Sequence, residues 1–207
     1  RGIFYKDNCI IDNYFKIKKD VELSSLSPSL FGLFNIENII AAYVVSRILK
    51  IRDKDFIDVL GKFKGLPHRL ENIHQDKKLQ IINNSKATNL DATLNAILNY
   101  ENIYLILGGR SKEKDFKQIL SYNNKIIKIY LIGESAKIIS KQLKDTIVCE
   151  ICYNIEIATK KIFFDIKKTK FFNTILFSPS CTSFDQFLNF EKRGNFFKKI
   201  IRKHLLK

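Results

Sequence analysis

The stretches "IYLIL" (residues 103–107) and "IKIYLIG" (residues 127–133) decide the fold, because they are apolar almost throughout. A strand with one face in water alternates apolar and polar residues, whereas a parallel strand covered on both faces is hydrophobic along its length. Two such strands separated by a short amphipathic pattern indicate a sheet with helices on both sides. The sequence therefore predicts an α/β protein with a doubly wound, mostly parallel sheet.

The same alternation continues on either side of these two strands. We expect strands at residues 70–75, 79–83, 102–107, 126–132, 146–150 and 172–177, and helices at residues 89–100, 114–122, 134–144, 154–162 and 184–206. In a sheet of this kind ligands bind beyond the carboxyl ends of the strands, where loops lead into helices. Three strand-to-helix turns therefore become candidates for a site.

The N-terminal third has a different pattern. Residues 3–18 predict a small hairpin that turns at "KDN", and residues 23–35 form a turn-rich connection. Helices are expected at residues 36–50, with Asn35 as N-cap, and at residues 54–63. In "KGLPHRL" (residues 64–70), Gly65 and Pro67 interrupt the helical pattern. We place a domain boundary there, between residues 1–66 and 67–207.

Length and charge set limits on the class of protein. The chain has 207 residues, a hydrophobic content of 45% and a formal net charge of +15. This length is enough for one domain and part of another. The positive charges are mostly lysines spread over nearly every segment, without the concentrated stripe of a nucleic-acid-binding surface. We therefore expect no nucleic-acid partner.

The four cysteines and the apolar runs indicate the compartment. Cys149 and Cys152 form a CxxC pair without a second pair or metal-spaced histidines, so buried thiols are expected rather than zinc ligands or disulfides. No signal peptide is visible, and no apolar run approaches the roughly 20 residues of a membrane helix. We predict a cytoplasmic protein with no membrane segment. The chain begins at Arg1 and contains no Met, so we expect its natural start to lie upstream.

The first candidate turn is "NNSKATN" (residues 83–89). Thr88 and Asp91 fit a capping box, which explains the threonine without any ligand. Lys86 is different, because a cation beside a helix N-terminus is disfavoured by about 0.3 to 1 kcal/mol. An anion bound at this turn would reverse that penalty.

The second turn lies in "LILGGRSKEKDF" (residues 105–116). Gly108 and Gly109 end a buried strand, and Lys112 precedes the next helical pattern. Glycines permit a backbone geometry or a close approach that a side chain would block. A simple strand-ending turn explains the pattern equally well.

The third turn lies in "ILFSPSCTSFDQFLNFEKRG" (residues 175–194). Ser183 and Gln186 form a second possible capping box, and Asn189 is a possible cap that leaves the backbone N–H of Phe190 free to donate. Together the three turns bring hydroxyls, amide donors and two lysines to one edge of the sheet. That set suits a small molecule with two carboxylates.

Five stretches resemble the Mur ligase family: "GLFNIEN", "FKGLPHRLE", "NNSKATN", "LILGGRSK" with "DF" shortly after, and "SPSCTSFDQFLNFEKRG". They occur in the family's order, and the resemblance covers nearly everything from about residue 32 to residue 200. Within the family, the resemblance is to the enzymes that add D-glutamate to UDP-N-acetylmuramoyl-L-alanine in peptidoglycan synthesis.

The resemblance implies a fragment of a three-domain, ATP-dependent ligase. Residues 1–66 would be the end of the central ATP-binding domain, and residues 67–207 the Rossmann-like, amino-acid-binding C-terminal domain. The phosphate loop and the Mg²⁺ ligands would lie upstream, since no GxxxxGK[ST] pattern occurs here. The implied partners are UDP-N-acetylmuramoyl-L-alanine, D-glutamate and ATP. The enzyme is expected to be monomeric, and this chain alone is expected to be inactive.

The resemblance also assigns roles to side chains that bind the amino acid. Thr88 and Lys112 would hold the α-carboxylate of glutamate, and Ser183 with the backbone of Phe190 its side-chain carboxylate. Lys86 would act catalytically, near the transferred phosphate or the incoming carboxylate.

For the nucleotide, the resemblance implies Asn35 and Asn38 at the adenine, Arg69 near the ribose and phosphates, and Asn84 at the ribose. Alone, Asn35 predicts only a helix N-cap and Arg69 only a surface arginine. His68 is expected to pack or hydrogen-bond locally.

Two positions depart from the family pattern. The family commonly has "NDSKAT" where this chain has Asn84, and an amide offers one acceptor oxygen where a carboxylate offers two. Phe34 stands where the family's "HNxxN" has histidine.

Three other functions remain open at this point. One is a related ligase for another amino acid, of Mur or folylpolyglutamate type, against which "SKATN" and "SPSCTSFDQF" argue. Another is a non-catalytic binding module of the same fold, and Asn84 is the main reason to consider it. The last is nucleic-acid binding through the positive surface.

Overall fold

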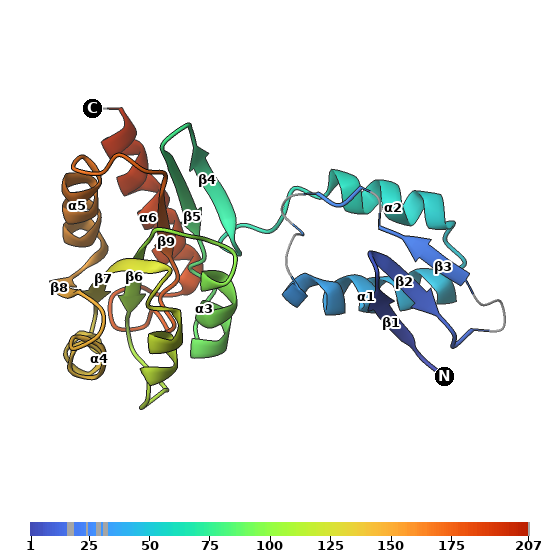
Figure 1. Ribbon diagram of the computed structural model, residues 1–207, viewed down its shortest axis with the longest axis horizontal. Helices are drawn as coiled ribbons and strands as arrows, with labels where there is room; N and C mark the ends of the chain where they lie inside the picture. Colours follow the sequence, from blue (N-terminus) through green and yellow to red (C-terminus); the bar gives the residue numbers. More distant parts are fainter. Residues whose placement is uncertain (16–18, 24, 28–29, 31–32, 207) are drawn as a thin grey trace. The chain divides into compact units, whose positions relative to one another are not determined.

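A computed structural model describes residues 1–15, 19–23, 25–27, 30 and 33–206 of the chain (Figure 1). The chain forms two compact units, unit 1 (Arg1–Gly65) and unit 2 (Leu66–Lys207). The division lies one residue from the boundary placed in "KGLPHRL". Each unit has its own hydrophobic core.

Unit 1 combines a small antiparallel sheet with two helices. Its elements are β1 (Ile3–Lys6), β2 (Cys9–Asp12), β3 (Lys19–Glu22), α1 (Leu33–Ile48) and α2 (Asp53–Lys62). The expected hairpin is present, and its turn residues Asp7 and Asn8 have φ of 48° and 61°, the left-handed geometry that suits a two-residue hairpin turn. The third strand was not predicted, and residues 16–18 of the predicted hairpin lie outside the described residues.

Helix α1 begins earlier than predicted. It starts at Leu33, so Asn35 lies in its first turn and is buried rather than acting as N-cap. The prediction of Asn35 as a cap is therefore wrong, because the helix continues toward the N-terminus past this residue. The connection expected at residues 23–35 falls partly outside the described residues, at 24, 28–29 and 31–32.

Unit 2 is built on a six-stranded sheet of order β4-β5-β9-β6-β7-β8. The strands are β4 (Glu71–Gln75), β5 (Leu79–Asn83), β6 (Ile103–Gly108), β7 (Ile126–Ile132), β8 (Cys149–Tyr153) and β9 (Asn173–Phe177). Five strands are parallel and only the edge strand β4 is antiparallel. The predicted doubly wound, mostly parallel sheet is therefore confirmed.

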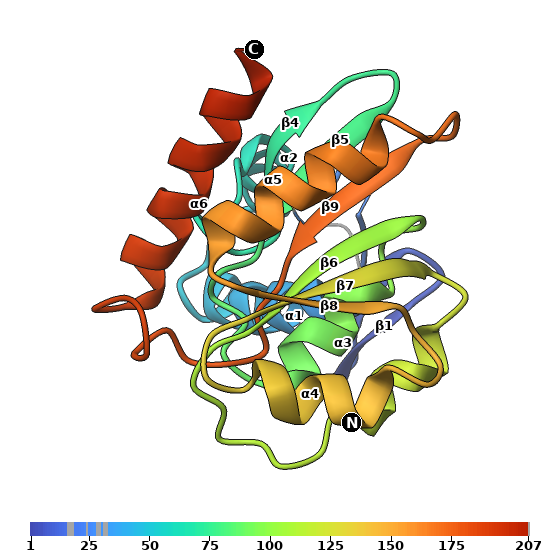
Figure 2. The same ribbon diagram turned by 90° about the vertical axis from the view of Figure 1, so that its left-hand side faces the viewer.

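Helices cover both faces of this sheet (Figures 1 and 2). They are α3 (Leu90–Ile97), the 3₁₀ helix η2 (Lys117–Tyr122), α4 (Ala136–Leu143), α5 (Ile155–Ile166) and α6 (Phe190–Leu205). Alternate residues of β6 enter opposite cores: Leu105 packs with α3, η2 and α4, and Ile106 with α5 and α6. In the described part of the chain no helix is long and apolar enough to cross a membrane.

Two predicted helices differ from the structure. In the segment predicted at residues 114–122 only a 3₁₀ helix forms, from Lys117, and the N–H of Phe116 just before it donates to the side chain of Gln142 at 2.7 Å. In the segment predicted at residues 184–206 the carbonyl of Ser183 accepts the N–H groups of Gln186 and Phe187 in a single turn. The helix begins only at Phe190, after its N-cap Asn189.

The described cysteines are all free, as expected. Cys152 and Cys181 are fully buried and Cys149 partly so. Burial raises the pKa of both Cys149 and Cys152 to about 11, which keeps these thiols protonated and unreactive at neutral pH.

An ion-pair network joins β7, β8 and α5. The ammonium of Lys128 lies 2.6 Å from Glu150 and 2.8 Å from Asp165, and the hydroxyl of Tyr130 donates to Asp165 at 2.6 Å. The hydrogen bond from Lys128 lowers the pKa of Glu150. For Asp165, burial acts to raise the pKa, but the hydrogen bonds from Lys128 and Tyr130 outweigh it and the pKa is lowered.

We predict that Lys128→Met lowers the free energy of unfolding of unit 2 at pH 7 by about 1–2 kcal/mol. A lowered carboxyl pKa stabilises the fold only while the carboxyl is ionised, so the wild-type advantage is complete above the ordinary values of 4.5 and 3.8 and is lost as the pH falls below them. Urea unfolding followed by circular dichroism between pH 7 and about pH 3 measures this. Lys160→Met, at an exposed position of α5, is the control. An equal loss at every pH would contradict the explanation.

Candidate functional site

The carboxyl ends of the five parallel strands lie at one edge of the sheet in unit 2. The three predicted turns leave this edge: the first turn (residues 84–89) follows β5, the second turn (residues 109–116) follows β6, and the third turn (residues 178–189) follows β9. Arg110 and Thr182 pair across the second and third turns, with N–H to carbonyl distances of 3.1 and 3.0 Å. The N–H of Asn84 donates to the carbonyl of Phe177 at 2.8 Å. The three turns are thus joined along one edge.

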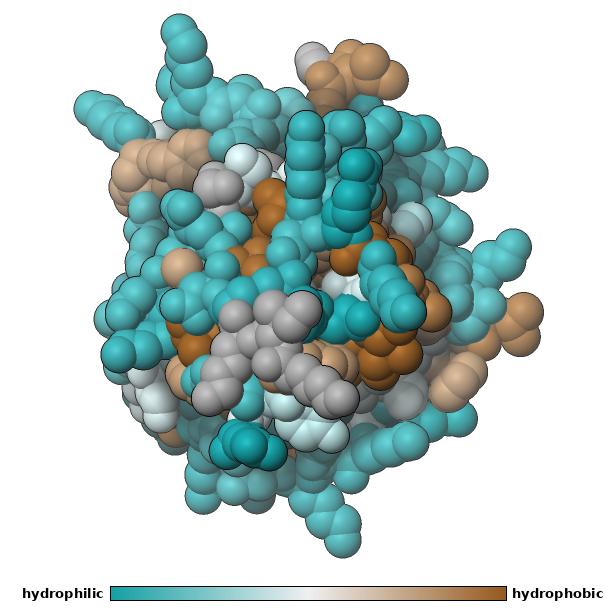
Figure 3. All heavy atoms as spheres, turned by 90° about the vertical axis from the view of Figure 1, so that its right-hand side faces the viewer, coloured by the Kyte–Doolittle hydropathy of each residue, from teal (hydrophilic) through white to brown (hydrophobic). Residues whose placement is uncertain are grey.

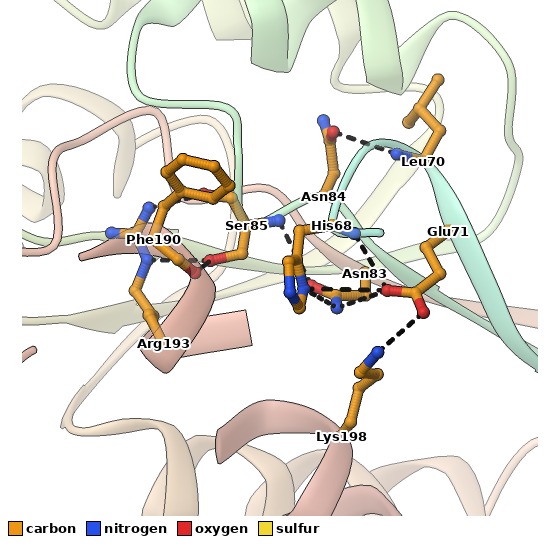
Figure 4. Close-up of polar contacts among 9 residues, drawn as sticks. All are labelled: His68, Leu70, Glu71, Asn83, Asn84, Ser85, Phe190, Arg193 and Lys198. Atoms are coloured by element: carbon orange, nitrogen blue, oxygen red, sulfur yellow. Dashed lines mark hydrogen bonds and ion pairs between the residues drawn. The ribbon is translucent and has the colours of Figure 1, made fainter. Parts of the chain in front are cut away.

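Arg193 connects the first and third turns, and its contact with Ser85 of the first turn is drawn in Figure 4. Its side chain is 1% exposed and donates from Nε to Ser85 Oγ (3.1 Å), from Nη2 to the Ser85 carbonyl (2.8 Å) and from Nη1 to the Cys181 carbonyl (2.9 Å). Burial lowers the pKa of Arg193 to about 10, so the guanidinium stays charged at neutral pH. Ser85 Oγ in turn donates to the Phe190 carbonyl at 2.8 Å, which ties the start of α6 to the first turn.

A neutral polar network fixes the first turn against β9. Asn84 is buried; its Oδ1 accepts the N–H of Leu70 at 3.2 Å, and its Nδ2 donates to Ser178 Oγ at 3.1 Å. Ser178 Oγ donates onward to Thr93 Oγ1 at 3.0 Å. Both polar atoms of the Asn84 amide therefore form a hydrogen bond inside the protein, which leaves one lone pair of Oδ1 and one hydrogen of Nδ2 for any further partner.

The first turn presents Thr88 and Lys86 outward. Thr88 was predicted to cap the next helix, but the cap of α3 is Asn89, whose side chain accepts the N–H of Ala92 at 2.9 Å. The prediction is wrong because α3 starts one residue later, and the hydroxyl of the half-buried Thr88 has no hydrogen-bond partner among the described residues. Lys86 is exposed, and its ammonium lies 5.6 Å from the centre of the Phe190 ring.

The second turn approaches the third so closely that it requires glycine. Gly109 has a φ of +140°, and a Cβ there would lie 2.5 Å from the carbonyl oxygen of Thr182. The expectation that this glycine permits a close approach is confirmed. Lys112, three residues later, is exposed and forms no ion pair with any described residue.

The third turn leads into α6 through an Asn cap. Asn189 accepts the N–H of Lys192 at 2.8 Å, so Phe190 is the first helical residue and its N–H has no partner within the helix. Ser183 is buried and uses its carbonyl to accept the N–H groups of Gln186 and Phe187 at 3.0 and 2.8 Å. The predicted capping box of Ser183 is wrong, because its hydroxyl has no hydrogen-bond partner among the described residues and the helix begins only at Phe190, with Asn189 as its cap.

A fourth turn (residues 133–135) completes this edge and was missed in the sequence. The carboxylate of Asp185 accepts the N–H of Glu134 at 3.1 Å, and Ser135 Oγ donates to the Gly109 carbonyl at 2.6 Å. Arg110 forms a bidentate pair with Glu134. The signal was available, since "IGES" follows an apolar strand as the other turns do.

The remaining candidate residues belong to both units. In unit 1, Asn38 is exposed on α1 beside an apolar groove of about 410 Å³, and apolar side chains reach the surface of this unit among hydrophilic ones (Figure 3). In unit 2, Arg69 is exposed directly after the buried His68. His68 is hydrogen-bonded to Asn83 at 2.9 Å, in agreement with the expected local role.

The donor set of the described residues does not fit a metal ion. Nowhere in this part of the chain do three or more His, Cys, Asp or Glu side chains gather as a possible metal site. What the edge offers instead is two exposed lysines and the N-terminal ends of α3 and α6. Backbone N–H groups at helix N-termini and nearby cations favour anionic ligands such as carboxylates and phosphates.

Sequence comparison finds relatives that cover most of this chain. A protein of Wolbachia sp. subsp. Brugia malayi, named "UDP-N-acetylmuramoylalanine--D-glutamate ligase", is 40% identical over 169 residues, which are 82% of this chain and 34% of the relative. Proteins of the same name from Rickettsia prowazekii and Buchnera aphidicola are 36% and 38% identical, covering 98% and 95% of this chain. The chain belongs to the Mur ligase family. The resemblance read from the five motifs is thereby confirmed.

Solved Mur ligase structures share the fold. The ligase MurF from Acinetobacter baumannii matches with a TM-score of 0.63 at 13% identity, over 99% of this chain and 44% of that one. The UDP-N-acetylmuramate-alanine ligase MurC from Thermotoga maritima matches with a TM-score of 0.62 at 16% identity, over 92% and 41%. No protein-family model matches the chain. This Mur ligase chain spans less than half the length of the relatives named here, at 34%, 45% and 44%.

We predict that Arg193→Lys lowers the free energy of unfolding of unit 2 by about 2–3 kcal/mol, because one ammonium cannot replace three directed bonds to two separate turns. Urea unfolding of the 207-residue chain measures the loss. Arg202→Lys, at an exposed position of the same helix, is the matched control and should change stability by less than about 0.5 kcal/mol. Equal stability of the two variants would show that the contacts of Arg193 contribute little.

Proposed function

We propose that this chain is the amino-acid-binding part of an ATP-dependent ligase that adds D-glutamate to UDP-N-acetylmuramoyl-L-alanine. Unit 2 corresponds in this proposal to the C-terminal, amino-acid-binding domain, and unit 1 to the end of the central ATP-binding domain. The ligase acts in the cytoplasm as a monomer in peptidoglycan synthesis. Because the chain spans less than half the length of its relatives, we expect it to be inactive by itself.

The observation that carries the proposal is the joining of the first, second and third turns along one sheet edge. The Arg110–Thr182 pairing places the turn of Lys112 beside the turn of Ser183, and the bond from Ser85 to Phe190 brings in the first turn. Cations, hydroxyls and N–H groups on these turns are the donors that two carboxylates of one amino acid require.

In this proposal the two carboxylates of D-glutamate bind to different turns. Thr88 and Lys112 hold the α-carboxylate, and Ser183 with the N–H of Phe190 holds the side-chain carboxylate. The hydroxyls of Thr88 and Ser183 have no hydrogen-bond partners among the described residues, so binding breaks no internal bond of theirs. Each charge-assisted bond contributes roughly 1.5 to 3 kcal/mol.

The reaction joins this amino acid to an activated carboxylate. ATP phosphorylates the terminal carboxylate of UDP-N-acetylmuramoyl-L-alanine, which gives an acyl phosphate. The free amine of D-glutamate then attacks the carbonyl carbon; the C–N bond forms, the bond to the phosphate oxygen breaks, and the amine loses a proton. Lys86, exposed at the first turn, stabilises the negative charge of the transferred phosphate or of the incoming carboxylate.

The nucleotide groups of the proposal are Asn35 and Asn38 at the adenine and Arg69 near the phosphates. Asn84 is the weakest member of this set, because its amide is used by Leu70 and Ser178. Mg²⁺ supplies charge neutralisation to phosphoryl transfer when it is bound. Since the described residues offer no donor set for it, we propose that its ligands belong to the part of the ligase that this chain does not span.

The alternatives are separated by a chimeric enzyme. This chain replaces the corresponding part of the Rickettsia prowazekii ligase, and ADP release is measured with UDP-N-acetylmuramoyl-L-alanine and D-glutamate, L-alanine, L-lysine or meso-diaminopimelate. We expect turnover with D-glutamate alone. Equal turnover with another amino acid would favour a different ligase. A folded chimera without any turnover would favour a non-catalytic module.

We predict that Lys112→Ala in this chimera raises the KM for D-glutamate by at least about tenfold, the equivalent of one charge-assisted hydrogen bond. Steady-state kinetics with D-glutamate as the varied substrate measure the change. Lys114→Ala is the control, because Lys114 is an exposed lysine of the same turn without a proposed role. If both variants keep wild-type kinetics, Lys112 does not bind the substrate.

A further inference from the structure

The segment before β4 is held on unit 2 by the residues that end β5 and begin the first turn (Figure 4). The carbonyl of His68 accepts the N–H of Lys86 at 3.0 Å, and the N–H of Leu70 donates to Asn84 Oδ1 at 3.2 Å. The motifs "GLPHR" and "NNSKA" are therefore parts of one hydrogen-bonded structure. Within it, His68 adopts a φ of +64°, which is uncommon for a residue with a side chain.

The ring of His68 occupies a space that exists only because residue 194 is glycine. A Cβ built on Gly194 would lie 2.3 Å from His68 Nδ1 and 2.9 Å from two ring carbons. Distances below 3.0 Å leave no room for a methyl group. Phe190, one helical turn earlier, meets the same ring edge-on with centroids 6.2 Å apart. The imidazole, 4% exposed, is thus enclosed by the first turns of α6.

The hydrogen bonds around the ring define its protonation. Asn83 Oδ1 accepts the N–H of Ser85 at 3.2 Å, and a backbone N–H can only donate, so the orientation of this amide is fixed. Asn83 Nδ2 then faces His68 Nδ1 at 2.9 Å and donates to it. The ring is neutral, with its proton on Nε2. Burial lowers the pKa of His68, in the same direction.

A second connection to α6 supports the same segment. Glu71 Oε2 accepts the N–H of His68 at 2.9 Å and the amide of Asn83 at 3.0 Å, while Oε1 accepts from Lys198 at 2.8 Å. The carboxylate therefore links the segment, β5 and α6. The residues on either side of this arrangement, Arg69 and Lys86, are the two exposed cations assigned to phosphate groups above.

We infer that His68 is a positioning residue: seated beside Gly194, it fixes the 66–70 segment on unit 2 and thereby sets the positions of Lys86 and Arg69 at the edge of the site. The identity of the groups that Lys86 and Arg69 bind rests on the proposed function. The contacts around His68 do not depend on it. A histidine that merely filled core volume would stabilise unit 2 without controlling the N–H of Lys86.

Amide hydrogen exchange in the 207-residue chain tests the arrangement without any substrate. His68→Ala and Gly194→Ala should each speed exchange of the Lys86 amide by at least about tenfold relative to amides of the central strand β6. In the double variant the Lys86 amide should exchange no faster than in His68→Ala alone. Without the imidazole ring, the methyl group added at position 194 has nothing to displace. His74→Ala, which removes a partly exposed imidazole from β4, is the control and should leave the Lys86 amide unchanged.

Two results of this experiment would overturn the inference. One is unchanged exchange at Lys86 in His68→Ala. The other is additive effects of His68→Ala and Gly194→Ala, which would show that alanine at 194 perturbs α6 independently of the ring. If Gly194→Ala does not fold, His68→Gln replaces it: a side chain that keeps a neutral acceptor should recover part of the protection, and no recovery would contradict the role of Nδ1.

Kinetics of the chimeric ligase test the consequence for the site. His68→Ala should raise the KM for ATP by at least about tenfold and by more than the KM for D-glutamate, since Lys112 and Ser183 lie on other turns. Equal changes in both KM values would overturn the positioning role. A chimera without activity in its unmodified form would instead remove the proposed function, and the exchange experiment would still decide the arrangement around His68.

Discussion

The edge of the sheet in unit 2 depends on the burial of one guanidinium. Arg193 is almost fully enclosed, yet its three hydrogen-bonded acceptors are a hydroxyl and two carbonyls, with no carboxylate among them. Moving a charge out of water costs much free energy unless its donors are satisfied. Ser85 and Cys181 must therefore stay where their oxygens accept hydrogen bonds from the guanidinium group. A lysine or an apolar residue would leave the two turns without this connection. The cation thus holds the first and third turns together from below.

The buried amide side chains of Asn83 and Asn84, on either side of the start of the first turn, form a directional hydrogen-bond network. Asn83 is oriented by the N–H of Ser85, and Asn84 by the N–H of Leu70. The NH₂ group of Asn83 then donates to His68 and Glu71, and that of Asn84 to Ser178. A carboxylate at position 84 would have no hydrogen to donate to Ser178 Oγ and would reverse that bond. The asparagine that departs from the family pattern is therefore matched to its surroundings. Its two hydrogen bonds hold the first turn in place independently of any contact with a nucleotide.

The sequence was informative where the physical signal was local. Uniformly apolar strands such as residues 103–107 predicted the parallel sheet, and the glycine of the second turn predicted a close approach. Capping residues were misplaced by one or more positions, at Thr88 and Ser183, because several residues in each turn are able to cap and tertiary contacts select one. Arg193 was given no role, although it stands with Phe197 and Ile201 on the buried face of α6, where a charge is unexpected. Its partners lie about 12 and 108 residues away, beyond the reach of any local pattern.

The division between buried and exposed cations has a consequence for binding. Arg193 is fixed by its acceptors and belongs to the framework, whereas Lys86 and Lys112 are exposed and form no ion pair with a described residue. An anionic ligand at this edge therefore meets lysines whose charges are not already neutralised, on turns that need not rearrange. The framework reduces the ordering cost of the backbone, and the ligand has only to order two flexible side chains. Affinity of this kind depends on screened, solvent-facing charges, so it weakens as ionic strength rises, while the contacts of Arg193 beneath it do not.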